Sequence, residues 1–269
     1  MLYRSGFVIA LVALTGLAHG AETTPLPPEQ LARAVQTDSI TIPTPGELFS
    51  ALSKPGKPNW IAQYRAPIPT TYRNRAQIAL NLGGLIADGF IAVEAQDSQQ
   101  VKNIGTDILK LAKALGVSEN VLGRGKSINE FAENSEWDAL QEELEATQNE
   151  VKASMQSNRD RDFVILVSLG GWVRGTQVVS GSVMQEYNPE TARVLRQPAL
   201  VSFMQTKMND ISPELREEPL VKSVNAQLGE IQKLVTFPNN GTPTAEEVQQ
   251  LNGAVSKLMG EIQSKTDAK

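Results

Sequence analysis

The sequence predicts an all-α fold, a multi-helix bundle that follows an N-terminal Pro-rich irregular strap. Three observations support this prediction. From Arg75 onward, apolar residues recur at spacings of three and four, which is the period of one helix face. Capping side chains and prolines mark helix starts throughout the same region. Strict alternation of apolar and polar residues is missing there, and residues 39–44 are the only stretch of the sequence that resembles a strand.

Residues 1–20 are typical of a cleavable secretory signal peptide. Arg4 supplies the basic start, residues 7–17 form the apolar core, and small residues precede the expected cleavage after Gly20. The core is shorter than the roughly 20 apolar residues that span a bilayer. No Cys follows it, which excludes a lipid-anchored lipoprotein. We therefore expect an exported bacterial protein, periplasmic or extracellular, that is not integral to the membrane after signal cleavage.

Residues 21–73 form the predicted strap. Nine of the 15 prolines fall between Pro25 and Pro69, and each proline removes a backbone donor and disfavours helical geometry in the residue before it. Residues 44–47, Thr-Pro-Gly-Glu, predict one short helical turn with a capping box. Aromatic residues predict that the strap packs across the helical body. They are Phe49, Trp60, Tyr64 and Tyr72.

Residues 74–269 form the predicted helical domain. We expect helices over residues 75–97 and 98–115, with Gly116 ending the second. A narrow apolar stripe on an otherwise polar segment from Trp137 to Met155 predicts an outer helix. Residues 163–181 are apolar on nearly every face, which predicts a central helix.

The C-terminal part of this domain shows further helix starts. Residues 189–209 and 213–235 each begin with a capping residue and a proline, and Pro219 predicts a break within the second. Capping boxes are predicted at Ser127 to Glu130 and at Thr244 to Glu247, the latter opening the last helix.

A short internal echo links two of these helices. Residues 81–84, Asn-Leu-Gly-Gly, resemble residues 168–171, Ser-Leu-Gly-Gly. Glycine costs a helix interior about 1 kcal/mol relative to alanine, so paired glycines imply a packing benefit. A degenerate duplication would explain the match, but we favour two helices that independently need glycine at a close crossing.

Composition excludes several kinds of chemistry. The chain has no Cys, and its single His, His19, lies within the predicted signal peptide. Catalysis by Ser-His-Asp or Cys-His groups is therefore excluded in the mature protein, as are disulfides and the usual zinc, copper and haem sites. We expect no cofactor and no metal. The formal net charge of −5 disfavours binding to nucleic acid.

Four residues are candidates for ligand binding: Asp88, Glu94, Asp97 and Arg174. Arg174 lies in the apolar central helix and needs a partner there, because a buried unpaired charge is costly. Asp88 is the first candidate for that partner, while Glu94 and Asp97 would be solvated or cap the next helix. In the functional interpretation, Arg174 with polar neighbours would hold a ligand carboxylate or phosphate.

The absence of catalytic His and Cys side chains, the long outer helices and the large Pro-rich strap favour a non-enzymatic exported protein with a structural or protein-interaction role. Its partner would dock on an outer helix. The alternative is an extracytoplasmic small-molecule- or glycan-binding protein, or a carboxylate-based hydrolase. The alternative requires a pocket in which the four candidate residues are partly open. A chaperone or adaptor would instead show an apolar groove beside the helix from Trp137 to Met155.

Overall fold

The computed structural model describes Gly46, Phe49 and residues 58–117, 119–157, 160–237 and 241–264. Gly46 and Phe49 are both helical, as the predicted turn requires, but Thr44, Pro45 and Glu47 lie outside the described residues. The predicted signal peptide and the strand-like residues 39–44 also lie outside them.

The described residues form helices and connections with no strand, which confirms the all-α bundle. The helices are η1 (Ile61–Gln63), α3 (Arg75–Glu94), α4 (Ser98–Leu115), α5 (Glu119–Gly123), α6 (Gly125–Glu133), α7 (Trp137–Ser157), α8 (Arg161–Gln185), α9 (Pro189–Ala192), η2 (Arg193–Leu195), α10 (Pro198–Asp210), α11 (Pro213–Arg216), α12 (Pro219–Thr236) and α13 (Ala245–Gln263).

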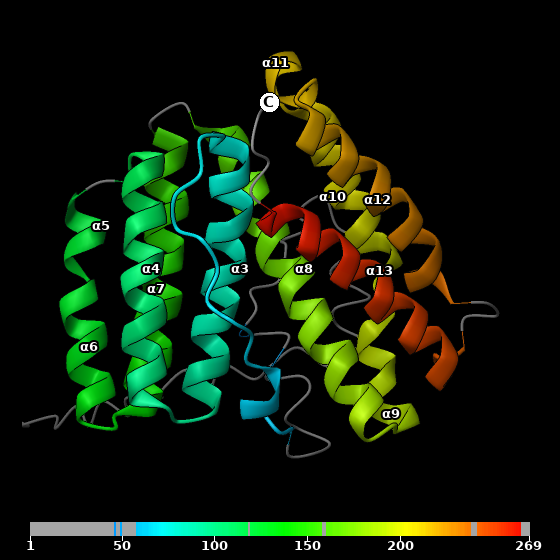
Figure 1. The fold of residues 1–269 in the computed structure, drawn as a ribbon, viewed down its shortest axis with the longest axis horizontal. Coiled ribbons are helices and arrows are strands. Elements are labelled where there is room, and N and C mark those ends of the chain that lie inside the picture. The colour runs from blue at the N-terminus through cyan, green and yellow to red at the C-terminus, as the bar shows by residue number, and fades with distance from the viewer. Residues whose placement is uncertain are drawn as a thin grey trace, which may run out of the picture.

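Two central helices, α3 and α8, separate two groups of outer helices (Figure 1). The pair forms the most extensive helix contact in the described part of the chain. Helices α4 to α7 lie on the α3 side, and α9, α10, α12 and α13 lie on the α8 side. The central pair therefore joins two layers of helices around a large apolar core, and a smaller apolar cluster lies among α3, α4, α6 and α7.

The glycine echo lies where α3 and α8 cross. A Cβ atom on Gly83 would lie 1.9 Å from the Val167 carbonyl oxygen, and one on Gly170 would lie 1.9 Å from the Leu80 carbonyl oxygen. Both approaches are too close for any side chain, so the predicted close crossing is confirmed. The contacts are reciprocal, because each glycine faces the residue three positions before the other.

Both central helices are apolar on almost every face. By length and composition alone, each could cross a membrane, but 94% of the apolar window of α3 and 78% of that of α8 are buried inside the protein. Burial of this kind is what a core helix of a helical bundle shows. The prediction of a central helix at residues 163–181 is therefore confirmed by α8.

Several predicted helix ends are confirmed. Helix α4 stops at Gly116, whose φ of 82° is a left-handed conformation that suits glycine. The capping box of Thr244 and Glu247 opens α13. A break separates α11 from α12, and Pro219 becomes the first residue of the second helix.

Three predicted boundaries are wrong. The helix expected over 189–209 is divided into α9, η2 and α10, because Pro198 cannot continue a helix and starts a new one. Helix α6 begins at Gly125, before the predicted capping box, and Ser127 Oγ lies 2.9 Å from Glu143 Oε1 on α7 instead. Helix α3 ends at Glu94, and Asp97 is the N-cap of α4.

The described part of the strap, residues 58–73, runs along α3 and contacts α8 through η1 (Figure 1). Trp60 is 9% exposed and its ring packs at 5.3 Å from that of Phe49. Tyr64, Ile68 and Tyr72 pack against the same core. This segment therefore covers the central pair, as its aromatic residues predicted.

Candidate functional site

Asp88 on α3 lies between two arginines. Arg174 Nε on α8 donates to Asp88 Oδ1 at 2.8 Å, as the sequence predicted. Arg65 Nε from the strap donates to Asp88 Oδ2 at 2.8 Å. Arg65 was not predicted as a partner, because it lies in a Pro-rich segment without a helical register that would place it. We call Arg65, Asp88 and Arg174 the charged cluster.

Arg174 connects four parts of the molecule. Its Nη2 donates to the Gln63 carbonyl oxygen in the strap at 2.6 Å, and its Nη1 donates to Gln177 Oε1 at 2.8 Å. Gln177 Nε2 in turn donates to Ser256 Oγ on α13 at 3.1 Å. The Arg174 side chain is 5% exposed. These charge-assisted hydrogen bonds are stronger than neutral ones and tie the strap to α3, α8 and α13.

Arg65 is less completely satisfied than Arg174. Its Nη2 lies 2.5 Å from Asp88 Oδ2, an ionic contact without hydrogen-bond geometry, and neither Nη1 nor Nη2 has a hydrogen-bond partner among the described residues. Burial is the main cause that lowers the pKa of Arg65, and the nearby Arg174 lowers it further, while Asp88 opposes both. Arg65 is thus a buried cation with unused donors.

The other two predicted site residues do not join the charged cluster. Asp97 caps α4 by accepting from the Gln100 backbone N–H at 2.9 Å, and Tyr64 Oη donates to it at 3.4 Å. Burial, with the neighbouring Asp97 carboxylate, raises the pKa of Tyr64 to about 12. Glu94 is half-buried at the end of α3 and does not line the pocket beside Asp88.

A pocket of about 180 Å³ adjoins the charged cluster beneath the strap. The strap forms one wall, and α3 and α4 form the others. The lining residues are Tyr64, Arg65, Ala66, Pro67, Ile68, Leu85, Asp88, Gln100, Asn103, Ile104 and Asp107. Asp88 and Arg65 therefore border an open space, while Arg174, 4% exposed, is sealed behind them.

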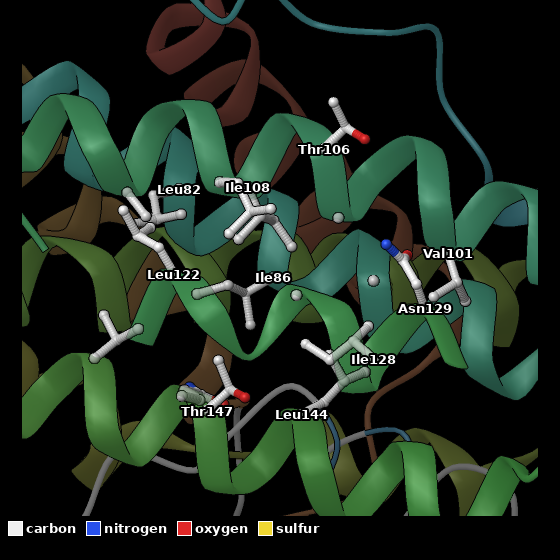
Figure 2. Close-up of a pocket in the computed structure, with 17 residues that line it drawn as sticks. Leu82, Ile86, Val101, Thr106, Ile108, Leu122, Ile128, Asn129, Leu144 and Thr147 are labelled. Carbon is white, nitrogen blue, oxygen red and sulfur yellow. The ribbon is translucent and has the colours of Figure 1, made fainter. Parts of the chain in front are cut away.

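A second, apolar cavity of about 80 Å³ lies among α3, α4, α6 and α7 (Figure 2). Figure 2 shows Ile86 and Ile108 extending between helices α6 and α4, with Leu144 and Thr147 approaching from α7. The remaining lining residues include Leu82, Val101, Leu109, Ala112, Leu122, Ile128 and Val151. Thr106 and Asn129 line the cavity and are exposed, so it opens to the surface between α4 and α6. We call this space the apolar cavity.

Two buried oxygens of the apolar cavity have no hydrogen-bond partner among the described residues. They are Thr147 Oγ1 and Gln148 Oε1 on α7. Gln148 is only 6% exposed, although glutamine is usually found on protein surfaces. Thr147 belongs to the apolar stripe that the sequence showed on α7, but the stripe gave no indication of a cavity.

The described residues contain no group of three or more His, Asp or Glu side chains that could hold a metal ion. Comparison of the chain with known protein families, with curated proteins and with solved structures finds no match. The features of the described residues that bear on function are the charged cluster, its pocket and the apolar cavity.

Proposed function

We propose that this chain is an exported, non-enzymatic helical protein that binds a partner protein, and that the partner inserts an apolar side chain into the apolar cavity. The observation that supports this proposal is the position of the cavity. It lies beside the outer helix α7 and opens between α4 and α6 at Thr106 and Asn129. Export rests on the signal-like residues 1–20.

The volume of the cavity favours a side chain over a whole ligand. At about 80 Å³ it is smaller than the space of roughly 150 Å³ that binds one benzene molecule. Sites for drug-sized molecules commonly measure about 300–1,000 Å³. Full burial of an aliphatic side chain contributes about 1.5–3 kcal/mol, which is roughly a tenfold to hundredfold gain in affinity.

A small-molecule-binding role is the alternative function, and the pocket beside Arg65 favours it. The hydrolase version has less support. Both carboxylate oxygens of Asp88 already accept from guanidinium groups, and Asp97 is engaged as a helix cap. A glycoside hydrolase needs two carboxyl groups available for proton transfer or nucleophilic attack.

Site-specific photo-crosslinking in the native host tests the proposed function. The crosslinking amino acid replaces Thr106 at the cavity mouth or, as a control, Thr206 on α10. Both threonines are exposed, and each Oγ1 donates to the carbonyl oxygen four residues earlier in its helix. We expect one discrete crosslinked partner at position 106 and none at position 206.

The purified partner then allows a second test. Thr147→Leu fills the apolar cavity and should weaken partner binding at least tenfold, because the inserted side chain loses its space. Identical crosslinked products at both positions, or unchanged affinity in Thr147→Leu, would contradict the proposed function.

A further inference from the structure

The part of the strap between Arg65 and Asn74 makes no hydrogen bond to any described residue. The hydrogen bonds of the strap stop at Arg65 and begin again at Asn74, so residues 66–73 neither donate nor accept within this part of the chain. Two of these residues, Pro67 and Pro69, have no backbone N–H at all. The other backbone groups must pair with water. Residues 66–73 are therefore attached to the bundle by side-chain packing alone.

Both ends of this segment are fixed. At one end, Arg65 Nε donates to Asp88 Oδ2 at 2.8 Å. At the other end, Asn74 Oδ1 accepts from the Gln77 backbone N–H at 2.9 Å and so caps α3, while Asn74 Nδ2 donates to Glu218 Oε2. Segments with few hydrogen bonds and few buried contacts open locally in native proteins at a lower free energy than the whole fold. The stretch between these two ends is a segment of that kind.

Two side chains hold the segment against the bundle, and neither packs fully. Ile68 and Tyr72 are partly buried against the core. The Tyr72 hydroxyl is buried without a hydrogen-bond partner among the described residues, and a buried hydroxyl that has lost its water is destabilising. Ile68 lines a pocket of about 180 Å³, although close-packed protein interiors leave few voids larger than a water molecule. The closed position of the segment is therefore only weakly favoured.

We infer that residues 66–73 form a lid that opens over the pocket beside Asp88 while the helical bundle stays folded, with hinges next to Arg65 and Asn74. The closed pocket is smaller than the roughly 300–1,000 Å³ of most sites for drug-sized molecules. Opening of the lid enlarges the pocket, so the access of molecules to this side of α3 and α4 depends on the lid. The lid is separate from the apolar cavity and does not depend on the proposed partner.

Thiol labelling measures the opening of the lid, because the chain has no Cys and one introduced thiol gives an unambiguous signal. Leu85→Cys places the thiol on α3 in the wall of the pocket, where Leu85 is 4% exposed. Leu169→Cys on α8 is the matched control, since Leu169 is 0% exposed and does not line the pocket. We expect the Leu85→Cys thiol to react at least roughly a hundredfold faster than the control. Its rate should hardly change in dilute urea, because opening of the lid exposes little surface, whereas the control rate should rise steeply.

Two substitutions in the lid should shift its opening in opposite directions. Ile68→Ala removes an apolar contact of the closed lid, so labelling of Leu85→Cys should become about tenfold faster. Tyr72→Phe removes the unpaired hydroxyl and keeps the ring, so labelling should become about fivefold slower. Tyr72 does not line the pocket, so slower labelling in Tyr72→Phe cannot come from a narrower pocket.

The inference is overturned if Leu85→Cys and Leu169→Cys react at the same rate with the same urea dependence, because the pocket then opens only when the bundle unfolds. It is also overturned if Tyr72→Phe leaves the labelling of Leu85→Cys unchanged, because the reagent then enters without movement of the lid. Ile104→Cys on α4, at a position that is 7% exposed in the same pocket, replaces Leu85→Cys if that variant does not fold. None of these outcomes affects the proposed partner site, which lies on the opposite side of α4.

Discussion

At the scale of single residues, Asp88 holds the strap and the two central helices together. It is 7% exposed and accepts one hydrogen bond from Arg65 and one from Arg174. Sequence reasoning predicted the pair with Arg174, since a charged side chain in an apolar helix must find a partner. It could not predict Arg65, because the partner came from an irregular segment whose path depends on tertiary packing.

Asp88→Asn tests the structural part of this residue's role. The substitution keeps the shape of the side chain but leaves two buried guanidinium groups without a counter-charge, which should lower the free energy of unfolding by about 3–5 kcal/mol. Urea denaturation measures the change. Glu230→Gln, in an ion pair whose side chains are 72% and 69% exposed, serves as the control and should cost less than about 0.5 kcal/mol. Equal losses in the two variants would show that the charged cluster contributes no more to the free energy of unfolding than an exposed ion pair does.

Tyr64 and Tyr72 make the stability of the fold decrease at alkaline pH. Burial is the largest cause that raises the pKa of each to about 12 from the ordinary value of 10.0. The folded state therefore keeps its tyrosine protons when the unfolded chain has begun to lose them. This contribution to stability is fully present below pH 10 and is lost as the pH rises toward 12.

Tyr72→Phe tests this pH dependence. The Tyr72 hydroxyl is buried without a hydrogen-bond partner among the described residues, so its removal should leave stability at neutral pH unchanged or raise it slightly. Between pH 10 and pH 12 the variant should lose stability less steeply than the wild type. Urea denaturation across that pH interval measures the slopes. Parallel curves would mean that Tyr72 does not titrate with a raised pKa.

At the scale of helices, the crossing of α3 and α8 fixes the centre of the fold. The glycine echo in the sequence predicted a close approach and the structure confirms it, since the positions of Gly83 and Gly170 leave no space for Cβ. The reciprocal contacts are compatible with a duplication as well as with two independent requirements for glycine.

Alanine at the crossing should be strongly destabilising. In Gly83→Ala or Gly170→Ala, the new Cβ would meet a backbone carbonyl oxygen at 1.9 Å, so the helices must separate. We expect losses of at least about 3 kcal/mol despite the helix propensity of alanine, as overpacking of a tight core is costly. Gly253→Ala in α13, where nothing lies within 4 Å of the new Cβ, should gain about 0.5–1 kcal/mol. Thermal unfolding of the three variants provides the comparison, and similar effects at all three positions would contradict the close crossing.

Helix prediction succeeded where the local sequence determines the ends. Gly116 stops α4 and Thr244 opens α13 because a left-handed glycine and a capping box act within one turn. Prediction failed where contacts between helices determine a helix start. Ser127, for example, donates a hydrogen bond to Glu143 on α7 instead of capping α6. The sequence analysis named a pocket around Asp88 and an apolar groove beside residues 137–155 only as what two alternative functions would require, and no residue pattern placed either space. A cavity depends on how several helices pack, and the spacing of residues along one helix does not reveal it.

At the scale of the whole molecule, the two candidate sites lie on the same half of the bundle. Helix α4 separates them, with the pocket beside Arg65 under the strap and the apolar cavity toward α6 and α7. The other half, α9 to α13, packs on α8 through a continuous apolar core. We therefore expect binding to concentrate on the α3–α7 half, while the α8–α13 half mainly supports it.

The apolar cavity makes a prediction about stability. Thr147→Leu replaces an unpaired buried hydroxyl with apolar atoms in a space that has room for them. The free energy of unfolding should rise by about 0.5–2 kcal/mol, as in other cavity-filling substitutions. Urea denaturation measures the gain, and a loss of stability would indicate that the space is already occupied.

The proposed function requires that the apolar cavity be open to a group of side-chain size, and this can be measured directly. Xenon enters apolar cavities of this kind, and methyl NMR under xenon pressure reports where it binds. We predict saturable shifts for the methyl groups of Ile86, Ile108 and Leu144 in the wild-type protein and none in Thr147→Leu. Absence of these shifts in the wild type, or their persistence in Thr147→Leu, would show that the cavity does not accept an apolar group.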